Sequence, residues 1–212
     1  MTTALVTRSA DRRTPRQRGR ETRQKLMTAT IGQLAGGSYR NVTVKNIASA
    51  VNTSPATLYQ YFAGVEEIVL EAAVDVARET KDALADFDGS WSYDGLNGAA
   101  RLVDAVLDVW TTHHSIVRVL TAVAAEQDPR FITAYAAITR PVTRALTYAV
   151  KQHATPGAAS PADRRAMVHN LTAALTAAAA QEGAGTIGGL NQEQRRAGLV
   201  LVVHATVTSA YV

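Results

Sequence analysis

The sequence of 212 residues contains no cysteine. This absence excludes disulfide bonds and thiolate metal sites, and it fits a reducing compartment such as the cytoplasm. A run of about eighteen apolar residues, the length that identifies a membrane-spanning helix, does not occur. No apolar signal core follows the charges near the N-terminus either. We therefore expect a cytoplasmic protein that has no membrane partner.

Patterns typical of β-strands are also lacking, because no segment alternates convincingly between apolar and polar residues. Apolar residues recur instead at steps of three and four, as in the helices expected over residues 22–35 and 65–86. We predict an all-α fold. A basic disordered arm at residues 1–21 precedes a three-helix unit at residues 22–64, and a larger helical bundle follows at residues 65–212.

Residue patterns that support catalysis or metal binding are weak. No Ser-His-Asp spacing, carboxylate pair or phosphate loop stands out, and the adjacent His113 and His114 would point about 100° apart on a helix. Gly183, Gly185 and Gly188 match the spacing of a dinucleotide-binding loop, which requires a strand before it and a helix directly after it. An alanine-rich helical segment precedes these glycines. We favour a flexible loop and predict no enzyme, metal or cofactor, with a nucleotide-dependent enzyme as an alternative.

Residues 41–62 have the layout of two short helices joined by a tight turn. Thr43 can cap the first helix, and Asn52 is the non-glycine residue that best tolerates the left-handed backbone of a sharp turn. Ser54 can cap the second helix, whose first position suits Pro55. This arrangement indicates a helix-turn-helix that reads double-stranded DNA, although an ordinary helical hairpin would carry similar caps.

The second helix of this pair combines two faces. Leu58 and Phe62 are expected to turn inward, whereas hydroxyl and amide groups face outward from Thr57, Tyr59, Gln60 and Tyr61. A helix of this size that carries such groups fits the major groove of DNA.

The net charge of +4 conceals a division along the chain. Residues 1–62 carry ten basic and two acidic side chains, a charge of +8, whereas residues 63–212 carry twelve basic and sixteen acidic ones, a charge of −4. The basic excess lies on the segment that holds the helix-turn-helix, where it would neutralise phosphates. We expect phosphate contacts from Arg18, Arg20 and Arg23, next to the first helix. Residues 8–13 fit a solvated tail equally well.

The last two predicted helices, at residues 161–182 and 191–211, are rich in small and apolar side chains. They can pack into the core of their own chain or against the same helices of a second copy. We favour the second option, because the other apolar helices already supply a core. A homodimer formed in this way would present two reading helices to a palindromic site.

The residues of the helix-turn-helix resemble those of TetR-family transcriptional regulators. The residues that sit at the usual motif positions of this family are Ile47, Ala48, Ser54, Thr57, Leu58, Tyr59, Tyr61 and Phe62. The resemblance implies DNA contacts, mostly to phosphates, from Thr43, Lys45, Ser54, Thr57, Tyr59, Gln60 and Tyr61.

Three positions depart from the family pattern. Asn52 replaces the usual turn glycine, Ser38 replaces a glycine before Tyr39, and Val65 stands where the fourth helix usually begins with a phosphate-binding lysine. We expect the phosphate contact at the start of that helix to be lost or moved.

The C-terminal segment at residues 203–211 resembles the ethionamide-resistance repressor subgroup, whose members bind an elongated apolar ligand. This resemblance implies a repressor that a small apolar effector releases from its operator. The side chains implied to line or flank the ligand channel are Leu107, Trp110, Tyr135, Val142, Leu146, Tyr148, Asn170 and Thr206. Aromatic residues at such helical spacing belong more often to an ordinary core than to a ligand site. An architectural DNA-binding protein without an effector is the alternative function.

Overall fold

A computed structural model describes residues 14–87, 96–153, 159–183 and 185–208 of the chain. These residues form an all-α fold, as predicted, with an isolated bridge between Ile187 and Leu190 as their sole β-type pairing. The elements are α1 (Pro15–Ala35), the 3-10 turn η1 (Tyr39–Asn41), α2 (Val44–Ala50), α3 (Pro55–Tyr59), α4 (Val65–Ala83), α5 (Asn97–Thr112), α6 (His114–Ala125), α7 (Pro129–His153), α8 (Pro161–Ala180) and α9 (Gln192–Thr208).

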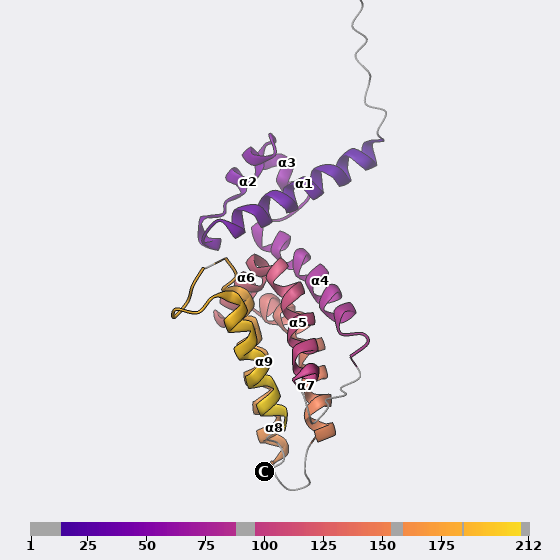
Figure 1. Ribbon diagram of the computed structural model, residues 1–212. Coiled ribbons are helices and arrows are strands. Elements are labelled where there is room, and N and C mark those ends of the chain that lie inside the picture. The colour runs from indigo at the N-terminus through magenta and orange to yellow at the C-terminus, as the bar shows by residue number, and fades with distance from the viewer. Residues whose placement is uncertain (1–13, 88–95, 154–158, 184, 209–212) are drawn as a thin grey trace, which may run out of the picture.

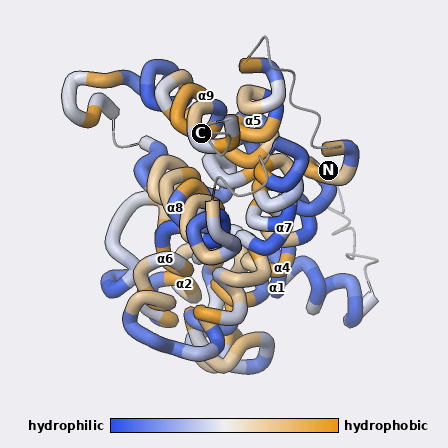
Figure 2. Tube along the Cα trace, turned by 90° about the horizontal axis from the view of Figure 1, so that it is seen from below, coloured by the Kyte–Doolittle hydropathy of each residue, from blue (hydrophilic) through white to orange (hydrophobic). Residues whose placement is uncertain are grey.

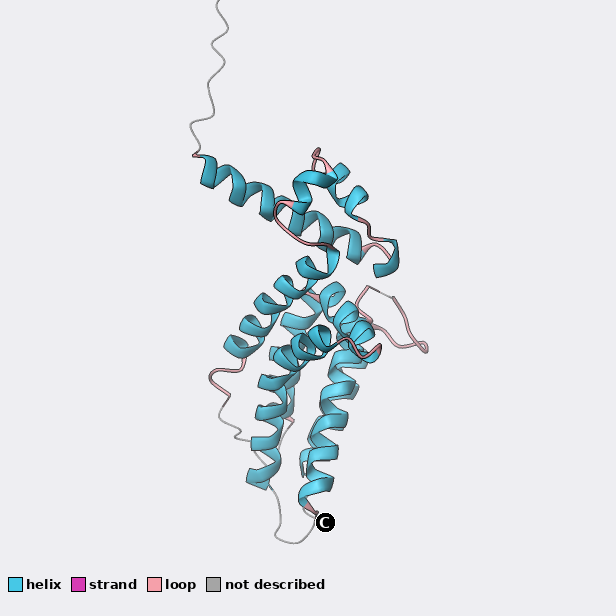
Figure 3. Cartoon of the chain, turned by 180° about the vertical axis from the view of Figure 1, so that it is seen from behind, coloured by secondary structure: helices cyan, strands magenta, loops and turns pink. Residues whose placement is uncertain are grey.

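The helices separate into two groups (Figure 1). Helices α1, α2 and α3 gather at one end of the molecule, and α4 leads from them into a bundle that also contains α5 to α9. The view from behind shows α1 crossing that end of the bundle (Figure 3). Helix α4 begins at Val65, so one continuous helix joins the N-terminal unit to the bundle.

Helix α1 begins earlier than predicted. We expected it to start at residue 22, directly after a disordered arm at residues 1–21, but it starts at Pro15, inside the range predicted for the arm. The Thr14 hydroxyl accepts a hydrogen bond from the Gln17 amide, and the Gln17 side chain accepts one from the Thr14 amide, which makes a capping box. The proline at the first helical position adds to this start signal. Residues 1–13 of the predicted arm lie outside the described residues.

The remaining helices agree with the expected pattern, with small differences at their ends. Helix α4 stops at Ala83 and α8 at Ala180, both earlier than predicted. Residues 209–211 of the predicted last helix lie outside the described part of the chain. Pro141 lies inside α7, which continues through it from Pro129 to His153.

A hydrogen-bonded polar pair lies within the core of the bundle. The Trp110 side chain is fully buried, and its Nε1–H donates to the Thr80 hydroxyl of α4 over 2.9 Å. Thr80 in turn donates to the carbonyl oxygen of Val76 over 2.7 Å. On the same pair of helices, the His113 ring lies 2.8 Å from the Glu79 carboxylate. These contacts fix the register of α4 against α5.

We expect the substitution Thr80→Val to lower the free energy of unfolding by about 1–3 kcal/mol, because it leaves the buried indole N–H of Trp110 without an acceptor. Urea unfolding at one fixed protein concentration measures the change. Thr112→Val is the matched control, since the Thr112 hydroxyl is exposed and its change should stay within about 0.5 kcal/mol. Equal losses in the two variants would contradict this role of Thr80.

Candidate nucleic-acid interface

The caps and the turn of the helix-turn-helix are confirmed. The Thr43 side chain accepts from the Asn46 amide over 3.2 Å, and the Ser54 side chain accepts from the Thr57 amide over 3.1 Å. Asn52 lies between the two helices with a φ angle of 54°, in the left-handed region. Local hydrogen bonds therefore set the angle between α2 and α3.

The two faces of α3 follow the prediction in part, because Thr57 and Tyr61, which we expected to face outward, are half-buried. Leu58 is fully buried and Phe62 nearly so, whereas the Tyr59 side chain is 59% exposed and Gln60 is exposed. The apolar face thus holds α3 against the N-terminal unit. Its other face presents a phenol and an amide, groups that can hydrogen bond to base edges or phosphates.

Helix α1 brings basic side chains close to α3. A Cβ atom at Gly19 would lie 3.6 Å from the Tyr61 hydroxyl, so Tyr61, which follows α3, lies beside the first half of α1. Arg18 and Arg20 flank Gly19 and are exposed. Lys45 is exposed near the start of α2. These cations and the polar face of α3 belong to one small unit of the molecule.

Arg23 differs from the phosphate-contacting residue that we expected. Both terminal nitrogens of its guanidinium donate to the Glu71 carboxylate of α4, and this hydrogen bonding raises the pKa of Arg23. The guanidinium also lies over the Phe62 ring, 4.5 Å from its centroid. Arg23 ties α1 to α4 behind the reading helix, so we correct its assignment from DNA contact to structural support.

The start of α4 carries negative rather than positive charge. Val65 is 7% exposed and packs in the core, and the first turn of α4 contains Glu66 and Glu67. Glu67 accepts from the Ala63 amide. Burial and a hydrogen bond to Glu66 raise the pKa of Tyr39. Whether the phosphate contact is lost or moved at this helix start stays a prediction, and the acidic first turn is its physical basis.

The residues expected at an effector channel do not share one location. Leu107, Trp110, Val142 and Leu146 are buried in the bundle, on α5 and α7. Tyr135 is half-buried on α7, with its hydroxyl 3.3 Å from that of Thr176 on α8. Thr176 is a polar partner that the sequence analysis missed, since no local pattern links two residues on different helices.

The other three expected channel residues lie at the surface of the chain. Asn170 is exposed on α8 and Tyr148 is 46% exposed on α7, whereas Thr206 is half-buried on α9. Asn170 was expected to line the channel, and that expectation is wrong for the single chain, in which its side chain is exposed. Asn170 lies on a face of α8 that the spacing of apolar residues in the sequence had assigned to the interior.

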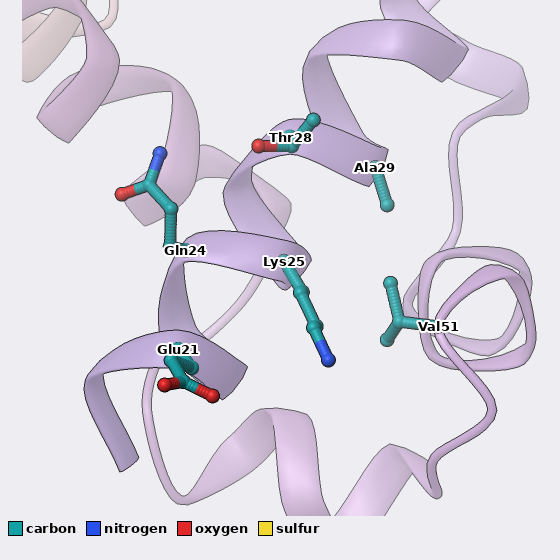
Figure 4. A pocket seen from close by; sticks show the side chains of 6 residues that line it. All are labelled: Glu21, Gln24, Lys25, Thr28, Ala29 and Val51. Carbon is teal, nitrogen blue, oxygen red and sulfur yellow. The ribbon is translucent and has the colours of Figure 1, made fainter. Parts of the chain in front are cut away.

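A groove lies on the N-terminal unit, between α1 and the end of α2 (Figure 4). Lys25 and Val51 point into it from opposite sides in this view. The full lining is Glu21, Gln24, Lys25, Thr28, Ala29 and Val51. These residues are distant in the fold from the buried side chains of α5 and α7, so this groove is not the predicted effector channel.

The glycine pattern at residues 183–188 lies in the connection between α8 and α9, which projects from the bundle (Figure 3). Gly183, Gly185 and Gly188 have positive φ angles. A helix, not a strand, precedes them, and α9 starts only at Gln192. The context that a dinucleotide-binding loop needs is therefore missing around these residues.

A capped helix-turn-helix on a basic three-helix unit, joined to a helical bundle, defines a class of DNA-binding transcriptional regulators. Two family descriptions match the chain, "Bacterial regulatory proteins, tetR family" over residues 26–72 and "Tetracyclin repressor-like, C-terminal domain" over residues 83–212. The chain belongs to the TetR family. It is therefore a transcriptional regulator and not an enzyme.

Individual relatives agree with this assignment. Helix-turn-helix transcriptional regulators of Mycobacterium tuberculosis and Mycobacterium bovis are 30% identical over 83 residues, which cover 35% of this chain and 39% of theirs. The chain thus matches about two fifths of the length of these curated relatives.

Solved structures share the fold at low sequence identity. The fatty acid degradation regulator FadR of Bacillus halodurans has a TM-score of 0.62 at 13% identity, covering 92% of this chain and 96% of its own. A transcriptional regulator of Saccharomonospora viridis, in complex with choline, has a TM-score of 0.58 at 22% identity, covering 85% and 94%. Over the described residues, no helix is long and apolar enough to cross a membrane.

We expect Asn52→Ala to lower the free energy of unfolding by about 1 kcal/mol, because alanine tolerates the left-handed backbone less well than asparagine. Asn52→Gly is the control and should change stability by less than about 0.5 kcal/mol, since glycine adopts this conformation freely. Urea unfolding compares the three proteins. A loss of stability in the glycine variant as large as that in the alanine variant would mean that the Asn52 side chain, rather than the backbone angle, matters here.

Proposed function

We propose that the chain acts as a homodimeric repressor in the cytoplasm, that it reads a palindromic operator with α3 of each subunit, and that a small apolar effector releases it. The observation that carries the proposal is the geometry of α3, a capped helix with its apolar side buried and Tyr59 and Gln60 exposed.

Charge supports the placement of DNA against the N-terminal unit. The segment up to residue 62 carries a charge of +8, and the rest of the chain carries −4. Duplex DNA is therefore attracted to one end of the molecule and repelled by the other. The contacts that we propose are those predicted from the sequence without Arg23, namely Arg18, Arg20, Thr43, Lys45, Ser54, Thr57, Tyr59, Gln60 and Tyr61.

An exposed apolar surface on α8 and α9 supports the dimer. Val203 and Val207 of α9 are fully buried in the chain itself, whereas Leu201 and Val202 are 56% and 52% exposed. Apolar stretches run along both helices in the view from below (Figure 2). On α8 the exposed residues include Ala173 and Ala177. Small residues there allow a second copy to approach closely, and a two-fold pairing would cover both helices.

The interior of the bundle supports an effector of apolar character. Leu107 of α5 and Val142 and Leu146 of α7 supply buried apolar surface inside the bundle, and the Tyr135–Thr176 pair supplies hydroxyl groups from α7 and α8. The Saccharomonospora viridis neighbour holds the small molecule choline, so a protein of this fold accommodates a ligand of that size. An effector can release the operator only by as much as it prefers the released conformation.

Selection of duplexes from a random library by the full-length chain tests the proposal, with nonspecific competitor present. A palindrome should be enriched, and the chain should bind it tightly enough to resist competitor. If binding depends on salt alone and no sequence is enriched, the chain is an architectural DNA-binding protein and the proposal fails.

We expect Lys45→Ala to reduce the slope of log affinity against log salt concentration by about one unit, because one phosphate contact and its counterion release are lost. A salt titration of binding to the selected duplex gives the slope. Lys81→Ala is the matched control, as Lys81 is exposed in the last turn of α4, far from α2 and α3. An unchanged slope for the Lys45 variant would remove this residue from the proposed contacts.

We expect Val202→Glu to dissociate the homodimer, because it would place two carboxylates in an apolar interface. Sedimentation equilibrium measures the molecular mass of the variant and of the unmodified chain. Val74→Glu is the control, since Val74 is 67% exposed on α4, outside the α8 and α9 surface. If the Val202 variant stays a dimer, the two-fold axis does not pass through this surface.

A further inference from the structure

Helix α1 ends without a cap from its own sequence. The last four carbonyl groups of a helix need partners from outside the helix. Gly36 follows α1 with φ −83° and ψ −5°, a right-handed conformation, and its amide bonds to the carbonyl of Gly32. Gly37 is not among the residues with positive φ, so the left-handed caps that commonly satisfy these carbonyls are not formed here. The last turn of α1 contains no basic residue.

A side chain from the bundle takes the place of this cap. Arg118 of α6 donates from its Nη2 atom to the carbonyl oxygen of Leu34 and, over 3.1 Å, to that of Gly37. A guanidinium at this end of a helix also interacts favourably with the partial negative charge of the helix dipole. Arg118 lies more than eighty positions after these carbonyls in the sequence, so the cap forms only when α6 is in place against α1.

The two helices joined by Arg118 belong to the two parts of the molecule. Helix α6 is anchored in the bundle by Ile116, Val117 and Leu120, which are fully buried. Leu34, whose carbonyl receives the hydrogen bond, has a fully buried side chain in the core that also contains Ile47 of α2 and Leu58 of α3. The end of α1 therefore contacts α6 on one side and, on the other, contributes to the core that holds the reading helix α3.

An ion pair also joins the two parts of the molecule, but it is exposed and does not cap a helix. Arg40 contacts Glu126, just after α6, over 3.0 Å, with both side chains largely exposed at 81% and 61%. An exposed pair of this kind contributes little to stability. It does not meet helix-terminal carbonyls, and it provides a matched arginine for comparison.

We propose that Arg118 is a positioning residue that couples the bundle to the DNA-reading unit by capping α1 from α6. A shift of α6 withdraws the guanidinium, the last turn of α1 opens, and the packing that seats α2 and α3 loosens. This inference rests on the proposed function, since it names the contact through which an effector signal passes. By reciprocity, operator binding must in turn favour the capped arrangement and stabilise α6.

Amide hydrogen exchange of the full-length dimer tests the coupling without an effector. The probes are the unmodified chain, Arg118→Met, Arg118→Lys and the control Arg40→Met, each free and bound to the selected duplex. In free Arg118→Met, exchange over residues 33–38 should be about tenfold faster than in the unmodified chain, because the last turn of α1 frays. Arg118→Lys should lie between the two, as it keeps one charged donor, and Arg40→Met should match the unmodified chain.

The effect of duplex binding on exchange in α6 separates coupling from a purely structural role of Arg118, because a purely structural role would leave that effect unchanged. In the unmodified chain and in Arg40→Met, duplex binding should slow exchange in α6. In Arg118→Met at saturating duplex, this slowing should be lost. The inference is overturned if Arg118→Met shows unmodified exchange at residues 33–38, or if the duplex slows exchange in its α6 as strongly as in the unmodified chain. A chain that enriches no duplex overturns both this inference and the proposed function, whereas enrichment with equal exchange overturns the inference alone.

Discussion

The reading helix α3 has five residues, too few for a helix to be stable by itself in water. Its place in the molecule therefore depends on the burial of Leu58 and Phe62 in the core that α1, α2 and α4 also line. Arg23 strengthens this packing, because its guanidinium lies over the Phe62 ring and also pairs with Glu71 of α4. The exposed face of α3 can be polar and selected for DNA because the opposite face supplies the stability.

Helix α1 connects the reading helix α3 to the bundle. Its first half lies beside Tyr61, its middle is tied to α4 through Arg23, and its end is capped by Arg118 of α6. The orientation of the reading unit is thus set by contacts with two helices of the bundle, besides the covalent link through α4. In the coupling that we propose, a molecule that moves either helix would change the position of α3. Such a connection allows a regulator to be controlled from a site that does not touch DNA.

Local signals predicted the helix-turn-helix well. Thr43, Asn52 and Ser54 act through neighbours within a few residues, so the pattern alone was sufficient to predict their roles. The start of α1 was also predictable, because Thr14 and Gln17 have the spacing of a capping box, but that signal was overlooked. Contacts made by Arg23 and Arg118 join residues 48 and more than eighty positions apart, and no local pattern encodes them.

The helical bundle was harder to predict in detail. Periodicity identifies an apolar face, yet it does not say whether that face meets the core, a ligand or a second subunit. Asn170 was placed inside by register and is exposed in the single chain, and Thr206 is half-buried, whereas Trp110 and Leu146 are in the core. The exposed faces of α8 and α9 are those that a dimer would cover.

In the dimer that we propose, two chains hold their reading helices at a spacing that matches the turn of the double helix. The absence of native cysteine allows a single spin label at Ser49→Cys, an exposed position on α2 outside the proposed contacts. Pulsed dipolar spectroscopy on the duplex-bound protein should give one narrow distance between subunits, consistent with reading helices about 34–36 Å apart. A protein that binds the duplex without any dipolar coupling between labels would contradict the account.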